Sequence, residues 1–119
     1  MSRLLPALLL ALLLAGCAAP AVRETPLALE VPFAPGVTLH ASAQVLMANG
    51  YVVRYADAEL GRLEAVFSRW PGYRVRVTVA GTDEQSRVSL TATRGGRPLP
   101  PQTLNRLVVE LQEQLGIRR

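Results

Sequence analysis

The chain has 119 residues, with 13 basic residues that are all arginine, nine acidic residues and a formal net charge of +4. This length is typical of one small domain, and the single cysteine, Cys17, excludes a core held by disulfides within the chain. So modest a surplus of positive charge gives no argument for binding nucleic acid.

The first residues of the chain have the layout of a secretory signal peptide. Arg3 supplies a positive start, residues 4–14 are leucine and alanine apart from Pro6, and two small residues precede Cys17. The apolar run is too short to cross a bilayer, because a spanning helix needs roughly 20 residues. We therefore predict that residues 1–16 are a cleaved signal peptide.

The tetrapeptide Leu14-Ala15-Gly16-Cys17 resembles the lipobox of bacterial lipoproteins. The resemblance implies that the Cys17 thiol carries diacylglycerol, that the signal is cut before it, and that the new amine is acylated. The alternative is an ordinary secreted protein with a chance cysteine near the cut. Because no Asp follows the cysteine, the family analogy implies the periplasmic face of the outer membrane, with the inner membrane as the alternative.

Residues 17–35 are predicted to be a lipidated N-terminus and a tether. Up to Pro26 the stretch is rich in small residues, contains proline and has no periodicity, which is typical of a flexible spacer. Residues 27–33 alternate apolar and polar side chains, and two interpretations remain open for them. They fit a short edge strand, where proline is tolerated, or an extended lead-in.

Two helices are predicted, one at each end of the domain. Thr38 is a plausible N-cap of the first, which Gly50 would end, and its apolar stripe consists of Leu39, Ala43, Leu46 and Met47. The last helix would open at Pro100-Pro101 and close at Gly116, with an apolar face of Leu104, Leu107, Val108, Leu111 and Leu115.

Between the helices the apolar period changes to two, in four segments at 51–55, 62–68, 73–79 and 87–93. Each has one apolar and one polar face, which indicates a sheet covered on one side only. We predict a single α+β domain over residues 36–119. It would be a four-stranded antiparallel meander with an N-terminal and a C-terminal helix packed on one face.

The predicted turns give a register for this sheet. A loop of three residues, 70–72, and a loop of four, 82–85, keep the apolar side chains on one face, and a slip of one residue would not. In this register the polar face has the neighbours Arg54–Glu64–Thr78, Val66–Arg76–Thr91 and Ser68–Arg74–Thr93.

The order of elements, and Gly50-Tyr51 followed by a strand of the form Gly61-x-Leu63-x-Ala65, resembles small envelope lipoprotein domains. Their best-known member is the C subunit of the outer-membrane β-barrel assembly machinery, whose domains have a helix-grip fold. The resemblance covers roughly residues 36–116 and implies this fold. It defines no functional residue, and likeness of fold carries no activity with it.

Residues that could support catalysis are sparse in this sequence. His40 has no carboxylate or second histidine at ligand spacing, and Asp57 and Asp83 fall in predicted turns. Gly95-Gly96 follows the last strand without the pattern of a phosphate loop, and no metal-ligand spacing occurs. We predict a protein that is not an enzyme and holds no metal or cofactor beyond the lipid on Cys17.

The polar sheet face offers one candidate binding surface, at Arg74 and Arg76. In the predicted register neither has a carboxylate opposite, and paired guanidinium groups bind phosphate or carboxylate. The alternative is a solvated face whose arginine stems cover the backbone. We expect a membrane-anchored accessory or scaffold that binds an envelope protein. Direct binding of an anionic lipid or glycan, and an immunity or inhibitor lipoprotein, are the alternatives.

Overall fold

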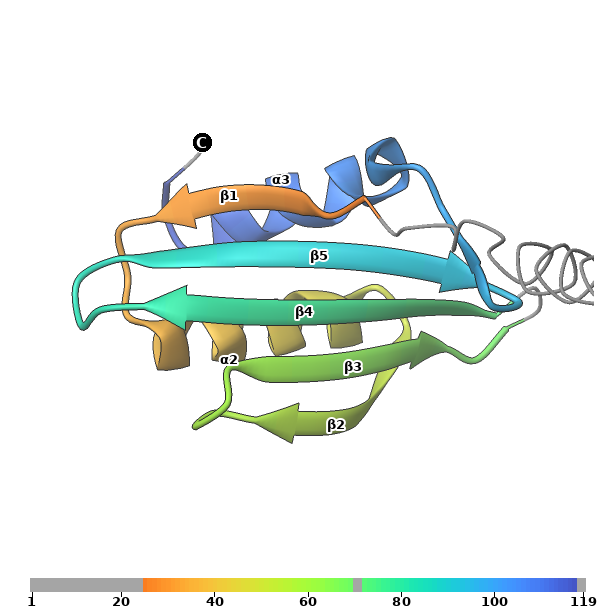
Figure 1. Cartoon of the computed structure of the whole chain (residues 1–119), viewed down its shortest axis with the longest axis horizontal. Coiled ribbons are helices and arrows are strands. Elements are labelled where there is room, and N and C mark those ends of the chain that lie inside the picture. The colour runs from red at the N-terminus through yellow and green to blue at the C-terminus, as the bar shows by residue number, and fades with distance from the viewer. Residues whose placement is uncertain (1–24, 70–71, 118–119) are drawn as a thin grey trace, which may run out of the picture.

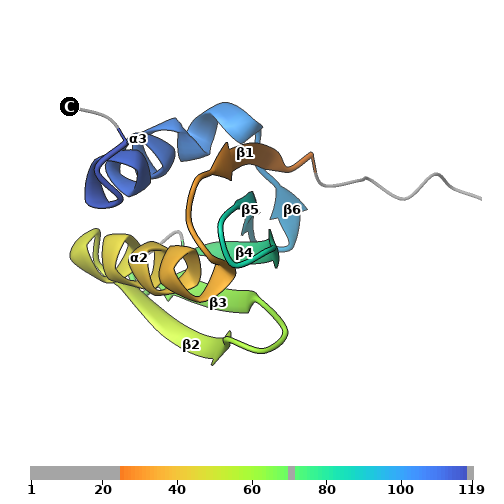
Figure 2. The same ribbon diagram turned by 90° about the vertical axis from the view of Figure 1, so that its left-hand side faces the viewer.

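Two helices cover one face of an antiparallel sheet in the computed structural model, which describes residues 25–69 and 72–117 (Figures 1 and 2). The predicted signal peptide, the predicted lipobox with Cys17 and part of the predicted tether lie outside these residues. The described elements are β1 (Leu27–Val31), α2 (Pro35–Ala48), β2 (Tyr51–Asp57), β3 (Arg62–Phe67), β4 (Tyr73–Gly81), β5 (Ser86–Arg94), β6 (Arg97–Pro98), a 3-10 turn η1 (Pro101–Leu104) and α3 (Asn105–Gln114).

The sheet has the strand order β1-β5-β4-β3-β2, and the short β6 pairs with the end of β5. All pairings between neighbouring strands are antiparallel. The α+β class is confirmed, and the four predicted strands correspond roughly to β2, β3, β4 and β5. The predicted four-stranded sheet was too small, because β1 and β6 extend it beside β5.

Residues 27–33, for which the sequence allowed either an edge strand or an extended lead-in, contain the strand β1. Its alternating side chains Leu27, Leu29 and Val31 lie opposite Leu90, Val88 and Ser86 of β5. Val31 is 1% exposed, so this strand closes one edge of the core. The predicted tether was therefore too long, since residues 27–31 belong to the sheet.

Helix α2 begins earlier than predicted. Ala34 is its N-cap and Pro35 is its first residue, while Thr38 is fully buried inside the first turn. The N-cap assignment of Thr38 was wrong, because proline is itself well suited to the first helical position. Its buried residues are Thr38, Leu39, Ala41, Ser42, Val45 and Leu46, and Met47 is 54% exposed. Apolar residues lie nearly all round this helix, so their spacing did not identify its buried side.

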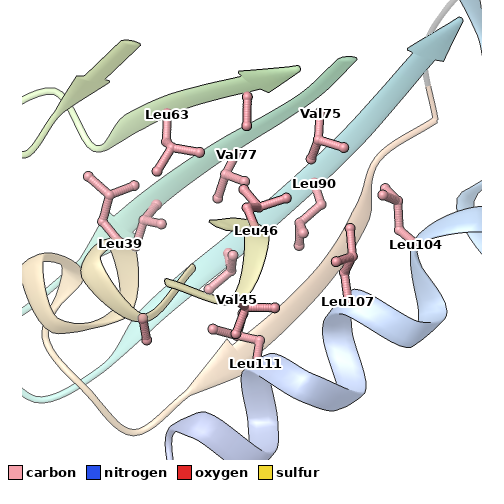
Figure 3. Close-up of a cluster of buried hydrophobic side chains, with 14 of the residues drawn as sticks. Leu39, Val45, Leu46, Leu63, Val75, Val77, Leu90, Leu104, Leu107 and Leu111 are labelled. Atoms are coloured by element: carbon pink, nitrogen blue, oxygen red, sulfur yellow. The ribbon is translucent and has the colours of Figure 1, made fainter. Parts of the chain in front are cut away.

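The core lies between the helices and the inner face of the sheet (Figure 3). Leu107 and Leu111 of α3 meet Val45 and Leu46 of α2 over Val77 and Leu90 of the sheet. The predicted apolar face of the last helix is confirmed, although the 3-10 turn η1, which ends at Leu104, replaces the first turn of that helix. Leu104, Leu107 and Leu111 are buried, and Val108 and Leu115 pack partly buried against the core.

Candidate functional site

The face of the sheet opposite the helices is open, and Figure 1 looks onto it with the helices behind. Its central strands carry polar side chains at every second position. Val75, Val77 and Val79 of β4 point into the core. The residues that alternate with them, Arg74, Arg76 and Thr78, are exposed. We call this surface the open face. It is the predicted polar face, and the predicted alternation of β4 is confirmed.

The register between β3 and β4 differs from the prediction by two residues. Glu64 lies opposite Arg76, and Val66 lies opposite Arg74. The loop between these strands covers residues 68–72 and not 70–72, although Trp70 and Pro71 lie outside the described residues. A loop of three and a loop of five residues leave the same side chains on each face, so the alternation did not distinguish them.

Arg74 has a carboxylate partner in the structure, although the predicted register placed no carboxylate opposite it. Its Nε lies 3.2 Å from Oε1 of Glu64, diagonally across the strands. The expected neighbours on the other side are confirmed, since Arg74 pairs with Thr93 and Arg76 with Thr91 of β5. The prediction of two arginines without carboxylate partners was therefore wrong for Arg74, because Glu64 offsets its charge.

A β-bulge in β2 changes which side chain faces Glu64. The register shifts between Val53 and Tyr55, so Arg54 is the extra residue and Tyr55 lies opposite Glu64. The predicted pairing of Arg54 with Glu64 was wrong for this reason. A bulge reverses the alternation beyond it, and Tyr55 therefore lies on the open face, where it is 48% exposed.

These shifts bring a different set of residues together around a hollow of about 460 Å³ on the open face. It is lined by Tyr55, Arg62, Leu63, Glu64, Arg76 and Thr78. We call it the β2–β4 hollow. Arg62 lies in β3, opposite Thr78 of β4. On the open face, this pair is the neighbour of the pair formed by Glu64 and Arg76. The sequence reasoning missed Arg62, because only the bulge and the longer loop bring it into this group.

The β2–β4 hollow has the chemistry of an anion site. Within residues 25–69 and 72–117, neither Arg62 nor Arg76 has a carboxylate oxygen within 4.0 Å. A guanidinium group offers a planar set of donors that matches a carboxylate or phosphate in two parallel hydrogen bonds. Thr78 and Tyr55 add hydroxyl groups at the rim. The arrangement can hold an anionic group between the two arginines. Their register partners are acidic, Asp57 opposite Arg62 and Glu64 opposite Arg76, and these carboxylates reduce the positive charge around the hollow.

A second cluster, at the end of the sheet near the start of α3, consists of aromatic side chains. The ring centroids of Tyr51 and Phe67 are 5.4 Å apart, and those of Phe67 and Tyr73 are 6.5 Å apart. Burial raises the pKa of the Tyr51 hydroxyl, and the neighbouring Tyr73 raises it further. With Arg106 and Thr103 these rings line a hollow of about 190 Å³. Phe67 is half-buried here and does not lie in the centre of the core.

Glu110 joins the two helices next to this cluster. The side-chain amide of Asn49, just after α2, donates a hydrogen bond to Glu110 Oε2, and Arg106 Nε lies 3.2 Å from Glu110 Oε1. The hydrogen bond from Asn49 is the main cause that lowers the pKa of Glu110, and Arg106 lowers it further. The charged carboxylate therefore stabilises the contact between α2 and α3.

The remaining candidate residues stand apart from these sites. His40 is exposed on α2, and Asp57 and Asp83 lie at or beside loops at one end of the sheet. In the described part of the chain, no group of three or more His, Cys, Asp or Glu side chains could hold a metal ion. No helix among the described residues is long and apolar enough to span a membrane.

No protein-family model matches this chain, and no curated protein matches it in sequence. Its function is therefore inferred from its own residues and their geometry.

Proposed function

We propose that this protein is a lipid-anchored, non-enzymatic binding protein of the bacterial envelope, and that its open face is the binding surface. The anchor would be Cys17, on the periplasmic face of the outer membrane. The role would be that of an accessory or scaffold in an envelope assembly. The signal-peptide layout and the lipobox Leu14-Ala15-Gly16-Cys17 support the anchor and the address.

The observation that carries the binding role is the exposed pair Arg62 and Arg76 around one hollow. The helices cover the other face of the sheet and complete the core there, so the open face needs no further packing for stability. Exposed arginines are among the side chains enriched at protein interfaces. The partner that fits this surface presents an acidic side chain to the β2–β4 hollow.

Direct recognition of an anionic lipid or glycan is the second candidate. It is favoured by the same hollow, which has room for one phosphate or carboxylate group between two guanidinium groups. The carboxylate of Glu64 in the hollow would repel a doubly charged phosphate monoester more than a singly charged carboxylate or phosphodiester, so it favours a ligand group with a single charge.

Charge reversal in the hollow tests both candidates. The variant Arg62→Glu with Arg76→Glu should lose the partner captured from solubilised envelopes and should fail to complement a deletion strain. Arg54→Glu with Arg87→Glu carries the same charge change on strands of the same sheet but outside the lining of the β2–β4 hollow, so it is the matched control for the hollow itself. Binding of purified protein to anionic lipids and glycans, lost in the same variant, would favour the second candidate.

Full complementation by the hollow variant, with unchanged thermal unfolding, would contradict a binding role for the open face. The next surface to test would then be the outer side of α3, around Arg106, Glu110 and Glu113.

A further inference from the structure

The exposed charges of the domain are unevenly distributed along the direction of the strands. The turns between β3 and β4 and between β5 and β6 lie at one end of the sheet (Figure 1). We call this the basic end, after the exposed Arg69, Arg94 and Arg97. The loops between β2 and β3 and between β4 and β5 lie at the opposite end and carry Glu59, Asp83 and Glu84, and Asp57 ends β2 beside them. Arg62 and Arg87 lie near these loops as well, so this end has an excess of acidic side chains.

Two of the arginines at the basic end face each other directly. Arg94 and Arg97 are register partners across the two-residue turn Gly95-Gly96, in which both glycines have positive φ. Like charges directly opposite on neighbouring strands destabilise a hairpin. In the part of the chain that the structure describes, neither has a carboxylate oxygen within 4.0 Å. An external anion bound between them would remove this repulsion.

The chain enters the sheet at the same end, because β1 begins there and runs toward the acidic loops (Figure 1). Only residues 18–24 separate Cys17 from Thr25, the first described residue. Eight residue steps span at most about 28 Å when fully extended. A lipid on Cys17 would therefore keep the basic end, and not the acidic end, next to the membrane surface.

We infer that the basic end docks on anionic lipid headgroups of the membrane that holds the anchor. This inference rests on the proposed lipidation of Cys17. Charge attraction acts over about 8 Å at physiological ionic strength, so it favours only the end that the tether holds near the surface. Guanidinium groups bind lipid phosphates through paired hydrogen bonds. With this end docked, the strands rise from the membrane and the β2–β4 hollow faces the periplasm.

Binding to vesicles tests the docking separately from the anchor. All residues of the described core lie between Leu27 and Leu115, so the test uses residues 17–119 with Cys17→Ser, which cannot carry lipid. The probes are vesicles of phosphatidylcholine alone and vesicles that also contain phosphatidylglycerol. We expect co-sedimentation with the anionic vesicles only, and weakening of that binding as salt is raised.

Reversal of the facing pair, Arg94→Glu with Arg97→Glu, should weaken binding to anionic vesicles by about ten-fold or more. The neutral variant Arg94→Gln with Arg97→Gln should show a smaller loss in the same direction. Arg54→Glu with Arg87→Glu has the same net charge as the reversed pair and should bind like the unchanged protein.

Equal loss in the control would show that net charge alone drives binding, and it would overturn the inference. Equal sedimentation with both kinds of vesicle would overturn it as well. Neither result bears on the anchor, which labelling of Cys17 with fatty acid tests independently.

Discussion

The hydroxyl of Thr38, in the first turn of α2, lies 2.9 Å from the hydroxyl of Ser86 at the start of β5, and both residues are buried. Ser86 Oγ donates to the carbonyl oxygen of Phe33, and Thr38 Oγ1 also lies 3.0 Å from the carbonyl oxygen of Ala34. The two hydroxyl groups have two protons between them for three hydrogen-bond contacts, one with each other and two with backbone carbonyl oxygens. The pair joins the chain that leaves β1 to the helix that follows and to the neighbouring strand.

Loss of this contact should lower stability by an amount typical of a buried hydrogen bond. We expect Thr38→Val, which keeps the shape of the side chain, to cost about 1 kcal/mol in the free energy of unfolding. Ser86→Ala should cost about 1–3 kcal/mol, because it leaves the Phe33 carbonyl without its donor. Denaturant unfolding of both single variants and the double variant gives the coupling. Strict additivity of the two changes would contradict the direct contact.

Gly61 should tolerate no side chain. It has a φ of +65°, and a Cβ atom at this position would lie 2.0 Å from the backbone oxygen of Val79. The same backbone segment is held by a hydrogen bond from Val79 N–H to Gly61 O, at 2.7 Å. Gly61→Ala therefore requires both a strained backbone and separation of β3 from β4, and we expect a loss of about 3 kcal/mol or more.

Gly95→Ala is the control for this substitution. Gly95 also has a positive φ, of +57°, but a Cβ atom there would meet nothing within 4 Å. The control isolates the cost of the backbone conformation, about 1–2 kcal/mol. Similar shifts in melting temperature for the two variants would mean that β3 and β4 do not approach each other as described.

The hydrogen bonds to Glu110 should make stability depend on pH. A carboxyl whose pKa is lowered by folding contributes stability that is present above its ordinary pKa of 4.5 and is lost as pH falls through the lowered value. Glu110→Gln should therefore be less stable than the unchanged protein at neutral pH, and the difference should shrink below about pH 4.5. Thermal unfolding from neutral to acidic pH measures it.

Glu113→Gln removes one exposed carboxyl from the same helix and is the matched control for Glu110→Gln. If both variants show the same change with pH, the contact of Glu110 with Asn49 contributes nothing to the stability of the domain.

Lipidation should depend on the thiol of Cys17. Cys17→Ser removes the group that takes diacylglycerol, so the variant should neither label with palmitate nor sediment with membranes through an anchor. Cells grown with labelled palmitate, followed by fractionation, give both measurements. Normal labelling of the variant would refute the lipobox assignment.

The local pattern of the sequence predicted the two helices, the four strands β2 to β5, and the face on which most residues of these strands lie. The alternation of β4, with Val75 and Val77 inward and Arg74 and Arg76 outward, could be predicted because adjacent side chains on a strand point to opposite faces. The pairing of Val79 with Val88 could also be predicted, since the loop between β4 and β5 has the four residues that the pattern demands. The end of α2 shortly before Gly50, which has a φ of +87°, followed from the same kind of local rule.

Only the tertiary structure decided which residues of the open face become neighbours. Alternation is unchanged by a shift of two residues, so it could not show that Glu64 pairs with Arg76 and contacts Arg74. The bulge at Arg54, which turns Tyr55 onto the open face, depends on how two backbones meet. The β2–β4 hollow and the uneven distribution of charge between the two ends of the sheet arise in the same way, because they join residues that are distant along the chain.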